Sequence, residues 1–459
     1  MYTSGVASAS PTTLDQYDVV VCGGGPTGTM AAVSAARNGA KTLVIERYGF
    51  PGGSSTAAMV HPWLSFHNKH GEQVLAGLGQ ELVDRLQAIG GAIGHVRDSI
   101  GFVYSLTPFD PDLTKQVMLR MLVESGADLM LHTFITDVQT TNGIVTAVRV
   151  VNKSGSQLIP AKFFIDATGD ADIAMRAGAP MQEQRKDGQL ITQPLTMNFR
   201  LSGVQWEPIR RYILDNPDEF HHETMFHELK RGEPLTAVSG YFSEWRKVNE
   251  KLNVPRDRLL FFSGVRPDEC YVNTSRVTQL DGADAFDLTA AEIEGRRQVT
   301  AIADWMKGNI AGFEDSYISM IPTQIGVRET RRILGDYVIN QNDVVNGSKF
   351  EDAIARSAYP VDIHAPTGAG LITSEAPDDY YEIPFRCLLL QGLDNVIVAG
   401  RCISATHEGH ASTRLTPTCF AMGQAAGLAA AQCASKNLLP RDIKGSQLRS
   451  KLREQGAVL

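Results

Sequence analysis

A glycine-rich turn near the start of the chain constrains the fold most strongly. Tyr17 to Cys22 is an apolar run rich in valine, as expected of a buried strand in a parallel sheet. Gly23, Gly25 and Gly28 follow in the spacing G-x-G-x-x-G, and small residues typical of a tightly packed helix come next. Gly23 permits a tight turn, Gly25 lets a pyrophosphate approach the backbone, and Gly28 lets the helix pack closely on the strand.

A second strand and an acidic residue complete this pattern. Pro26 and Thr27 begin the predicted helix, whose N-terminus offers N–H groups and partial positive charge to phosphates. Lys41 to Ile45 is a second apolar run, and it ends at Glu46, where a carboxylate can accept hydrogen bonds from ribose hydroxyls. A lone glycine pattern is weak evidence, since structural turns can mimic it. Here strand, helix, second strand and acid occur in order, which predicts dinucleotide binding.

A second glycine-rich turn distinguishes between dinucleotides. It follows Arg47 and contains Gly52, Gly53, Ser54 and Ser55. An NAD site needs no such turn, and the alternative is a plain surface loop. The segment resembles the second glycine motif of FAD-binding proteins with the glutathione-reductase type of fold, where it runs along the pyrophosphate towards the flavin ring. The resemblance implies FAD.

Two later segments resemble further parts of the same fold. The predicted strands Leu129 to Val138 and Ile144 to Val151, joined at Asn142-Gly143, form a hairpin signal. They resemble the small antiparallel sheet of that fold, in which one strand residue contacts adenine through its backbone; by position this is Ile135. An apolar strand then ends in Thr168-Gly169-Asp170, which resembles the third signature of the fold and implies contact with FAD.

The C-terminal part returns to the same fold. A buried strand is predicted to end at Gly400 and Arg401, and a helix rich in alanine and glycine is predicted over 418–434. The N-terminus of this helix would point its dipole at the flavin N1/O2 edge and stabilise the anionic reduced ring.

Together these motifs span nearly the whole chain, which resembles the FAD-dependent oxidoreductase family of glutathione-reductase-like fold. Ile325 to Arg332 and Ala399 to Ala405 are similar to stretches in a bacterial, mostly uncharacterised group of that family. More distantly, the chain resembles the fumarate reductase and thiazole-synthase flavoproteins.

The predicted architecture is α/β: a Rossmann-like FAD-binding domain, with a central parallel sheet and a small antiparallel sheet, and an inserted α+β substrate domain. Within the insert, 206–253 is predicted to be mostly helical, and a clear helix is predicted over 288–307. The predicted parts are a flexible leader (1–16), the first part of the FAD-binding domain (17–190), the substrate domain (191–380) and the returning part of the FAD-binding domain (381–459).

One short resemblance bears on the chemistry. His410 to Leu415 resembles the His-Gly-Ala-Asn-Arg-Leu stretch of fumarate reductase flavoproteins, where His and Arg face the substrate and hold its carboxylate. By position, this resemblance implies that His410 and Arg414 face the flavin. It also implies that Cys419 and Phe420 offer backbone N–H groups to flavin O2. The Ser-His-Thr segment that carries covalent flavin in those proteins is replaced by Gly53 to Thr56. This departure implies non-covalent FAD and argues against a fumarate-type substrate.

Hydride transfer to a flavin needs a base for the substrate's proton and positive charge for its polar groups. His407, Glu408 and His410 lie together after the Gly-Arg strand, and histidine is a suitable base near neutral pH. The alternative for each is an ordinary loop residue. Arg328 is a candidate substrate anchor, with a salt-bridged surface as its alternative.

Composition excludes several other functions. The net charge of −8 disfavours a nucleic-acid partner, and no apolar run is long enough to span a membrane. The six cysteines form no CxxC pair, so neither a zinc site nor disulfide chemistry is indicated. No metal site is predicted: metal binding by His221, His222 and His227 has no supporting carboxylate or cysteine pattern, and exposed histidines are the favoured interpretation. These features favour the cytoplasm and leave a homo-oligomer open.

The sequence therefore predicts an FAD-dependent dehydrogenase or oxidase that acts on a small polar organic substrate. The absence of a second G-x-G-x-x-G argues against a separate NAD(P)H domain, so that the substrate itself would supply the electrons. Two alternatives are a flavoprotein subunit that relies on a partner for electron transfer and an FAD-scaffolded RNA-modifying protein. The acidic charge balance argues against the second.

Overall fold

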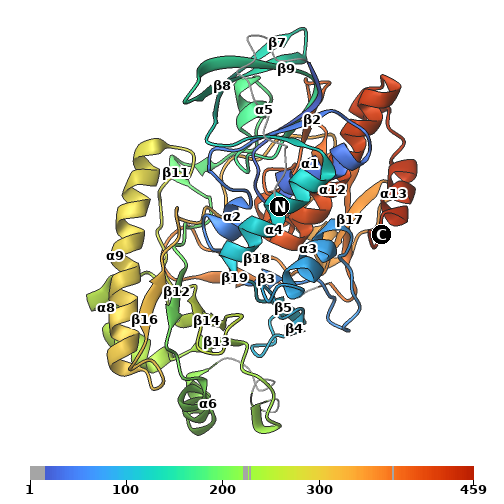
Figure 1. Ribbon diagram of the computed structural model, residues 1–459. Coiled ribbons are helices and arrows are strands. Elements are labelled where there is room, and N and C mark those ends of the chain that lie inside the picture. Colours follow the sequence, from blue (N-terminus) through green and yellow to red (C-terminus); the bar gives the residue numbers. More distant parts are fainter. Residues whose placement is uncertain (1–15, 221–225, 227–228, 375–376) are drawn as a thin grey trace.

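A computed structural model describes residues 16–459 except 221–225, 227–228 and 375–376 (Figure 1). Residues 1–15 of the predicted leader and the three histidines at 221, 222 and 227 lie outside the described residues. The mixed α/β architecture confirms the predicted fold class. No helix within the described ranges combines the length and apolar character that crossing a bilayer requires.

The largest sheet has seven strands and contains the predicted dinucleotide-binding unit. Its order is β6-β2-β1-β9-β8-β7, with β21 also paired to β9. The strands are β1 (Tyr17–Cys22), β2 (Thr42–Ile45), β6 (Asp128–Met130), β7 (Phe134–Thr141), β8 (Ile144–Asn152), β9 (Gly155–Asp166) and β21 (Val396–Val398). β7 and β8 form the predicted hairpin, and they extend from the parallel part of the sheet as its antiparallel end.

The long strand β9 belongs to both parts of this sheet. Its first half pairs antiparallel with β8, while its second half pairs parallel with β1 and β21. Asp166 lies in register with Cys22 on one side and Val398 on the other, and Cys22 lies in register with Ile45. Segments from both ends of the chain therefore leave the same edge of the sheet.

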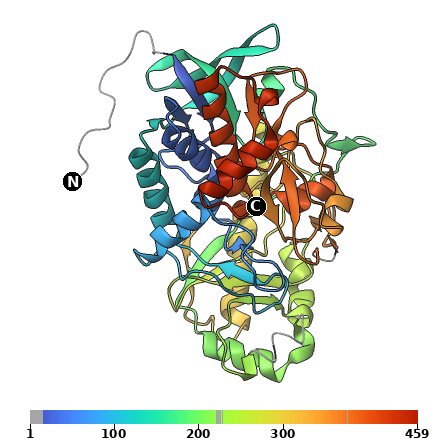
Figure 2. The same ribbon diagram turned by 90° about the vertical axis from the view of Figure 1, so that its right-hand side faces the viewer.

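Two helices from opposite ends of the chain pack against each other beside this sheet. Figure 2 shows α1 (Pro26–Arg37) next to α12 (Thr416–Lys436). Glycines allow the close approach: a Cβ on Gly423 would lie 2.2 Å from the Thr27 carbonyl oxygen, and one on Gly427 would lie 2.1 Å from that of Ala31. α3 (Leu78–Gln87), α4 (Pro111–Ser125) and α13 (Gly445–Glu454) pack around this pair.

A second, five-stranded antiparallel sheet has its own hydrophobic core. Its strands, in sheet order, are β13 (Ala237–Gly240), β14 (Leu259–Ser263), β15 (Cys270–Val272), β12 (Phe199–Ser202) and β16 (Tyr317–Met320). The helices beside it are α6 (Trp206–Asp215), α8 (Phe242–Leu252) and the long α9 (Ala285–Asn309). This core extends from Leu195 to Ile325, whereas Ile339 and Ile363 pack into the core of the large sheet. The domain boundaries stay a prediction.

One secondary-structure prediction in this region is corrected. The segment 206–253, predicted to be mostly helical, also contains β13, which is buried throughout and pairs with β14. Its short apolar run is surrounded by polar sequence, so the strand is stabilised by its neighbour in the sheet rather than by a strong local pattern.

The remaining elements are short. They are α2 (Gly53–Thr56), β3 (Trp63–Leu64), β4 (Val96–Arg97), β5 (Ser105–Thr107), α5 (Asp172–Arg176), β10 (Arg185–Lys186), β11 (Gln189–Leu190), α10 (Gln341–Val345), β17 (Ala353–Ser357), β18 (Asp362–His364), β19 (Leu371–Thr373), β20 (Tyr381–Pro384) and α11 (His407–Thr413).

The close contact between α1 and α12 can be tested with a Gly427→Ala variant. The new methyl group would collide with the Ala31 carbonyl oxygen, so the free energy of unfolding should fall by about 1–3 kcal/mol. Gly308→Ala is the matched control, because a Cβ there meets nothing within 4 Å in a helix, and it should stabilise by about 0.5–1 kcal/mol. Urea unfolding measures both, and equal changes in the two variants would contradict this packing.

Candidate functional site

A cavity of about 650 Å³ opens at the edge where the parallel strands end. Residues from the N-terminal, middle and C-terminal parts of the chain line it together. The sequence-predicted cofactor residues among them are Gly23, Gly25, Pro26, Thr27, Glu46, Arg47, Gly53, Ser54, Ile135, Thr168, Gly169, Asp170, Gly400, Arg401 and Cys419. The strand register explains this convergence, since these turns follow neighbouring strand ends.

The first glycine turn leaves room for a ligand at one position only. A Cβ on Gly25 would meet nothing within 4 Å, so the cavity reaches the backbone there. A Cβ on Gly28 would lie 1.8 Å from the Gly23 carbonyl oxygen, which explains the need for glycine at this helix–turn contact. The second turn packs on the first, because the Gly52 N–H donates to the Gly24 carbonyl over 2.8 Å.

Three other predicted cofactor residues support the site from behind its surface. Gly28 is buried against the first turn, while Ser55 Oγ accepts a 3.0 Å hydrogen bond from Trp63 Nε1. Phe420 is buried and packs edge-on against Trp63, with ring centroids 5.2 Å apart. These three residues and Gly52 do not line the cavity.

Glu46 fastens the first turn to the end of β2. Its Oε2 accepts the Gly24 N–H at 2.7 Å and its Oε1 accepts the Tyr48 N–H at 2.9 Å. The residue is only 5% exposed, and burial raises the pKa of its carboxyl group despite these hydrogen bonds. Arg47 Nη2 donates to Gln324 Oε1 at 2.5 Å, so that a segment of the second core closes this side of the cavity.

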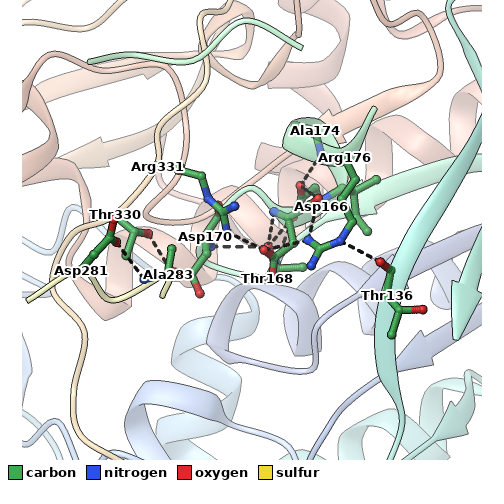
Figure 3. Close-up of polar contacts among 12 residues, drawn as sticks. Thr136, Asp166, Thr168, Asp170, Ala174, Arg176, Asp281, Ala283, Thr330 and Arg331 are labelled. Atoms are coloured by element: carbon green, nitrogen blue, oxygen red, sulfur yellow. Dashed lines mark hydrogen bonds and ion pairs between the residues drawn. The ribbon is translucent and has the colours of Figure 1, made fainter. Parts of the chain in front are cut away.

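The turn after β9 is held by a buried carboxylate (Figure 3). Asp166 accepts hydrogen bonds from Thr168 Oγ1 at 2.7 Å and from the N–H groups of Ile173 and Ala174 at 2.9 and 3.0 Å. Burial raises the pKa of Asp166 to about 6 in spite of these donors. The carboxylate thus fixes both the cavity-lining turn and the start of α5.

Asp170 connects this turn to two later segments. Its Oδ1 accepts hydrogen bonds from Thr330 Oγ1 at 2.6 Å and Arg401 Nη2 at 2.5 Å, and its carbonyl accepts one from Arg331 Nε at 2.8 Å (Figure 3 shows Thr330 and Arg331). The Asp170–Arg401 ion pair therefore joins the ends of β9 and β21 across the cavity wall.

One expectation for α12 is corrected. The helix begins at Thr416, two residues earlier than predicted, and the Cys419 N–H donates to the Leu415 carbonyl at 2.9 Å. Cys419 therefore has no free N–H group, and Phe420 lies a further residue into the helix. Thr416, which lines the cavity, and Thr418 occupy the first turn, where N–H groups have no partner within the helix.

The predicted catalytic histidines meet at Glu329, the neighbour of Arg328, for which the sequence predicted no catalytic role. His407 Nδ1 lies 2.9 Å from Glu329 Oε1, and His410 Nδ1 lies 3.9 Å from the same oxygen. Arg332 also pairs with this carboxylate. His410 is 1% exposed, and neither of its ring nitrogens has a hydrogen-bond partner among the described residues.

Burial controls the protonation of this group. It lowers the pKa of His410 well below 6.5, against the opposing effect of Glu329, so the imidazole is neutral at neutral pH. Burial alone would raise the pKa of Glu329, but His410, His407 and Arg332 lower it to about 2. His410 is therefore a neutral imidazole, and Glu329 beside it is a negatively charged carboxylate.

The other predicted catalytic residues lie in different surroundings. Arg414 lines the cavity, and its Nη2 is 3.6 Å from Asp362 Oδ2. Arg328 donates to the Pro194 carbonyl at 2.8 Å and to Thr196 Oγ1. Arg328, His407, Glu408 and His410 do not line the cavity themselves. Within the described ranges, no group of three or more His, Cys, Asp or Glu side chains could hold a metal ion.

Three buried histidines predict acid sensitivity. Burial lowers the pKa of His61 and of His364 to about 3, and that of His410 well below 6.5. The unfolded chain binds protons below pH 6.5 while these side chains stay neutral in the folded state. Stability should therefore fall as pH decreases from 6.5 towards 4, by up to about 1.4 kcal/mol per histidine per pH unit.

Urea unfolding at about pH 7.5 and about pH 5.5 measures this loss. His61→Gln should reduce the pH dependence, whereas His70→Asn, at an exposed position, should leave it unchanged. Equal free energies of unfolding at the two pH values would contradict the neutral burial of these side chains.

Comparison with known proteins identifies the family. A family model described as FAD dependent oxidoreductase matches residues 18–452. Thiamine thiazole synthase of Methanococcus aeolicus is 30% identical over 165 residues, which cover 35% of this chain and 57% of that protein. Digeranylgeranylglycerophospholipid reductase of Methanoculleus marisnigri is 28% identical over 204 residues, covering 39% of this chain and 46% of that protein. The match thus spans about half the length of these relatives.

Among solved structures, a geranylgeranyl bacteriochlorophyll reductase-like protein from Thermoplasma acidophilum has a TM-score of 0.49 and 13% identity, covering 97% of this chain and 85% of that one. The family assignment depends instead on the family model, which spans almost the whole chain. The cavity agrees with it, because Gly25 gives open access to the backbone and Glu46 lies beside the same turn. The chain belongs to the FAD-dependent oxidoreductase family, as an enzyme with FAD as its cofactor.

Proposed function

We propose that this enzyme oxidises a small polar organic substrate at a C–OH, C–N or C–C bond. FAD, when bound, supplies the acceptor for the hydride at flavin N5. The single observation that carries the proposal is His410, a buried neutral imidazole with two unpartnered ring nitrogens beside an ionised carboxylate. Such a group is arranged to accept a proton rather than to stabilise the fold.

The proton would be received at Nε2 of His410. Nδ1 is the nitrogen that lies 3.9 Å from Glu329, so Nε2 is left for the O–H or N–H group of the substrate. Glu329 would stabilise the imidazolium that forms, and its own position is fixed by Arg332 and by the hydrogen bond with His407. Glu329 and His407 are therefore positioning residues in this proposal.

Cofactor binding would depend on Glu46, whose hydrogen bonds hold the first glycine turn. We propose that this carboxylate also accepts hydrogen bonds from the ribose of FAD, in addition to those from Gly24 and Tyr48. The phosphates would lie at Gly25 and the N-terminus of α1, where N–H groups are free. These placements use only the cavity lining.

Glu46→Gln should weaken FAD binding at least about tenfold, because hydrogen bonds to a charged carboxylate contribute about 1.5–3 kcal/mol each. Fluorescence titration of the flavin-stripped protein with FAD measures the dissociation constant. Glu183→Gln, at an exposed position outside the cavity, is the matched control and should bind FAD normally. Equal affinity in both variants would remove Glu46 from the FAD site.

His410→Asn should retain FAD but slow flavin reduction by substrate about 10²–10⁴-fold, the usual contribution of a general base. An anaerobic screen of hydroxy acids, sugars and amines for loss of flavin absorbance supplies the substrate. Glu329→Gln should also slow reduction, because losing the negative charge lowers the pKa of His410 further. His70→Asn is the control at an exposed histidine.

The pH dependence separates a catalytic role from a structural one. Since the pKa of His410 lies well below 6.5, the rate of flavin reduction should show no break near pH 6.5 in the wild type. Unchanged reduction in the His410→Asn variant, or a wild-type rate that falls as a histidine of ordinary pKa is protonated, would overturn this assignment.

A further inference from the structure

Four arginine side chains lie near Asp362, and one of them, Arg414, lines the cavity. They come from separate segments: Arg256 precedes β14, Arg276 follows β15, Arg328 follows β16, and Arg414 follows α11. Arg256 and Arg276 are 6% and 2% exposed. The four guanidinium groups are close enough for three of them to lower the pKa of Arg328.

Only some of these donors have partners in the protein. Arg276 is partly satisfied: its Nη1 and Nη2 donate to the carbonyls of Ala365, Ala369 and Gly370 at 3.0, 3.2 and 2.9 Å, whereas its buried Nε has no partner within the described ranges. In contrast, the Arg256 guanidinium makes no hydrogen bond with any described residue. Arg414 Nε is buried and likewise has no partner within the described ranges. Buried guanidinium groups without acceptors are costly.

Negative charge in the cluster is also insufficient. Asp362 is its buried acid; Tyr359 donates to Asp362 Oδ2 at 2.9 Å, and Arg414 and His364 each lie 3.6 Å from that oxygen. Asp257, which is exposed, pairs with Arg258 and also lies close enough to Arg256 and Arg276 to raise the pKa of both. Burial, reinforced by the neighbouring arginines, lowers the pKa of Arg256 to about 10 and that of Arg328 well below its usual value. Four cations thus share one buried carboxylate among the described residues.

We propose that this cluster is an anion-binding subsite and that the substrate is a small organic anion carrying two or more negative charges. A single negative charge would leave most of the excess positive charge uncompensated, whereas a dicarboxylate or a phosphate ester would balance it. Arg414 both belongs to the cluster and lines the FAD cavity, so the anion would be held next to the cofactor. The inference rests on the proposed function, because it names the substrate class of that site.

The subsite is separate from the place proposed for the phosphates of FAD. Those phosphates would lie at Gly25 and the N-terminus of α1, whereas Arg256 and Arg328 come from the segments around the second sheet. None of Arg256, Arg276 and Arg328 lines the FAD cavity. The cluster is therefore assigned to the substrate.

Binding of defined probes to the FAD-loaded enzyme tests the subsite without turnover. The probes are succinate, glycerol 3-phosphate, acetate and the neutral glycerol. Thermal unfolding and the flavin difference spectrum detect their binding. We expect saturable binding of succinate or glycerol 3-phosphate that weakens at high salt, weaker binding of acetate, and none of glycerol. Succinate binding would indicate a dicarboxylate, and glycerol 3-phosphate binding a phosphate ester. Failure of both dianions to bind, or equal binding of glycerol, would overturn the proposal.

Variants separate ligand binding from stability. Arg256→Gln should weaken binding of the dianion at least about tenfold, with unchanged FAD content. Without ligand, its Tm should be equal or higher, because a buried charge that lacks an acceptor has been removed. The dianion affinity of Arg256→Lys should lie between those of the wild type and Arg256→Gln, because lysine keeps the charge but not the planar donor geometry. Arg246→Gln, an exposed arginine on α8, is the matched control.

A lower Tm with unchanged dianion binding in Arg256→Gln would show a structural arginine and contradict the subsite. Reduction of the flavin by a neutral substrate, unaffected by succinate and glycerol 3-phosphate, would also contradict it while supporting the proposed function. If no organic substrate reduces bound FAD although the dianions bind as expected, the proposed function fails and the subsite stands as an anion site.

Discussion

The parallel pairing of β9 with β1 and β21 is the constraint on which the site depends. It places Cys22, Asp166 and Val398 side by side at one edge of the sheet, although the three strands come from the beginning, the middle and the end of the chain. The turns that follow them must then face a common space, and this space is the cavity. The glycine contacts between α1 and α12 reinforce the same closure.

Around this cavity, buried charges divide into two groups with opposite balance. Glu329 is a carboxylate that pairs with Arg332 and His407 and lies beside the neutral His410. In the proposed function it would stabilise the proton that His410 accepts. The group of arginines near Asp362 has the opposite balance, because its positive charge exceeds the buried negative charge beside it. In the two proposals, the first group would accept a proton and the second would bind an anion, an arrangement suited to oxidation of a charged organic substrate.

Local sequence determines much of the nucleotide half of the fold. β1 has the predicted limits, and the hairpin turns at the predicted Asn142-Gly143, because valine-rich strands and asparagine–glycine turns are encoded by neighbouring residues. β13 was missed because its stability comes from pairing with β14, which only the folded chain supplies. The roles of Glu329 and Arg256 were not predictable either, since their partners are distant in sequence and their burial is a property of the packed structure.

Both ends of the chain line one cavity, in which we propose that FAD is bound non-covalently. The most direct measurement is the flavin content of the purified protein, followed by acid precipitation and identification of the released flavin by mass spectrometry. We predict about one flavin per chain, released into the supernatant as intact FAD. Protein that contains no flavin and takes up none when FAD is added would contradict FAD binding in this cavity, and flavin that stays with the precipitate would contradict non-covalent binding.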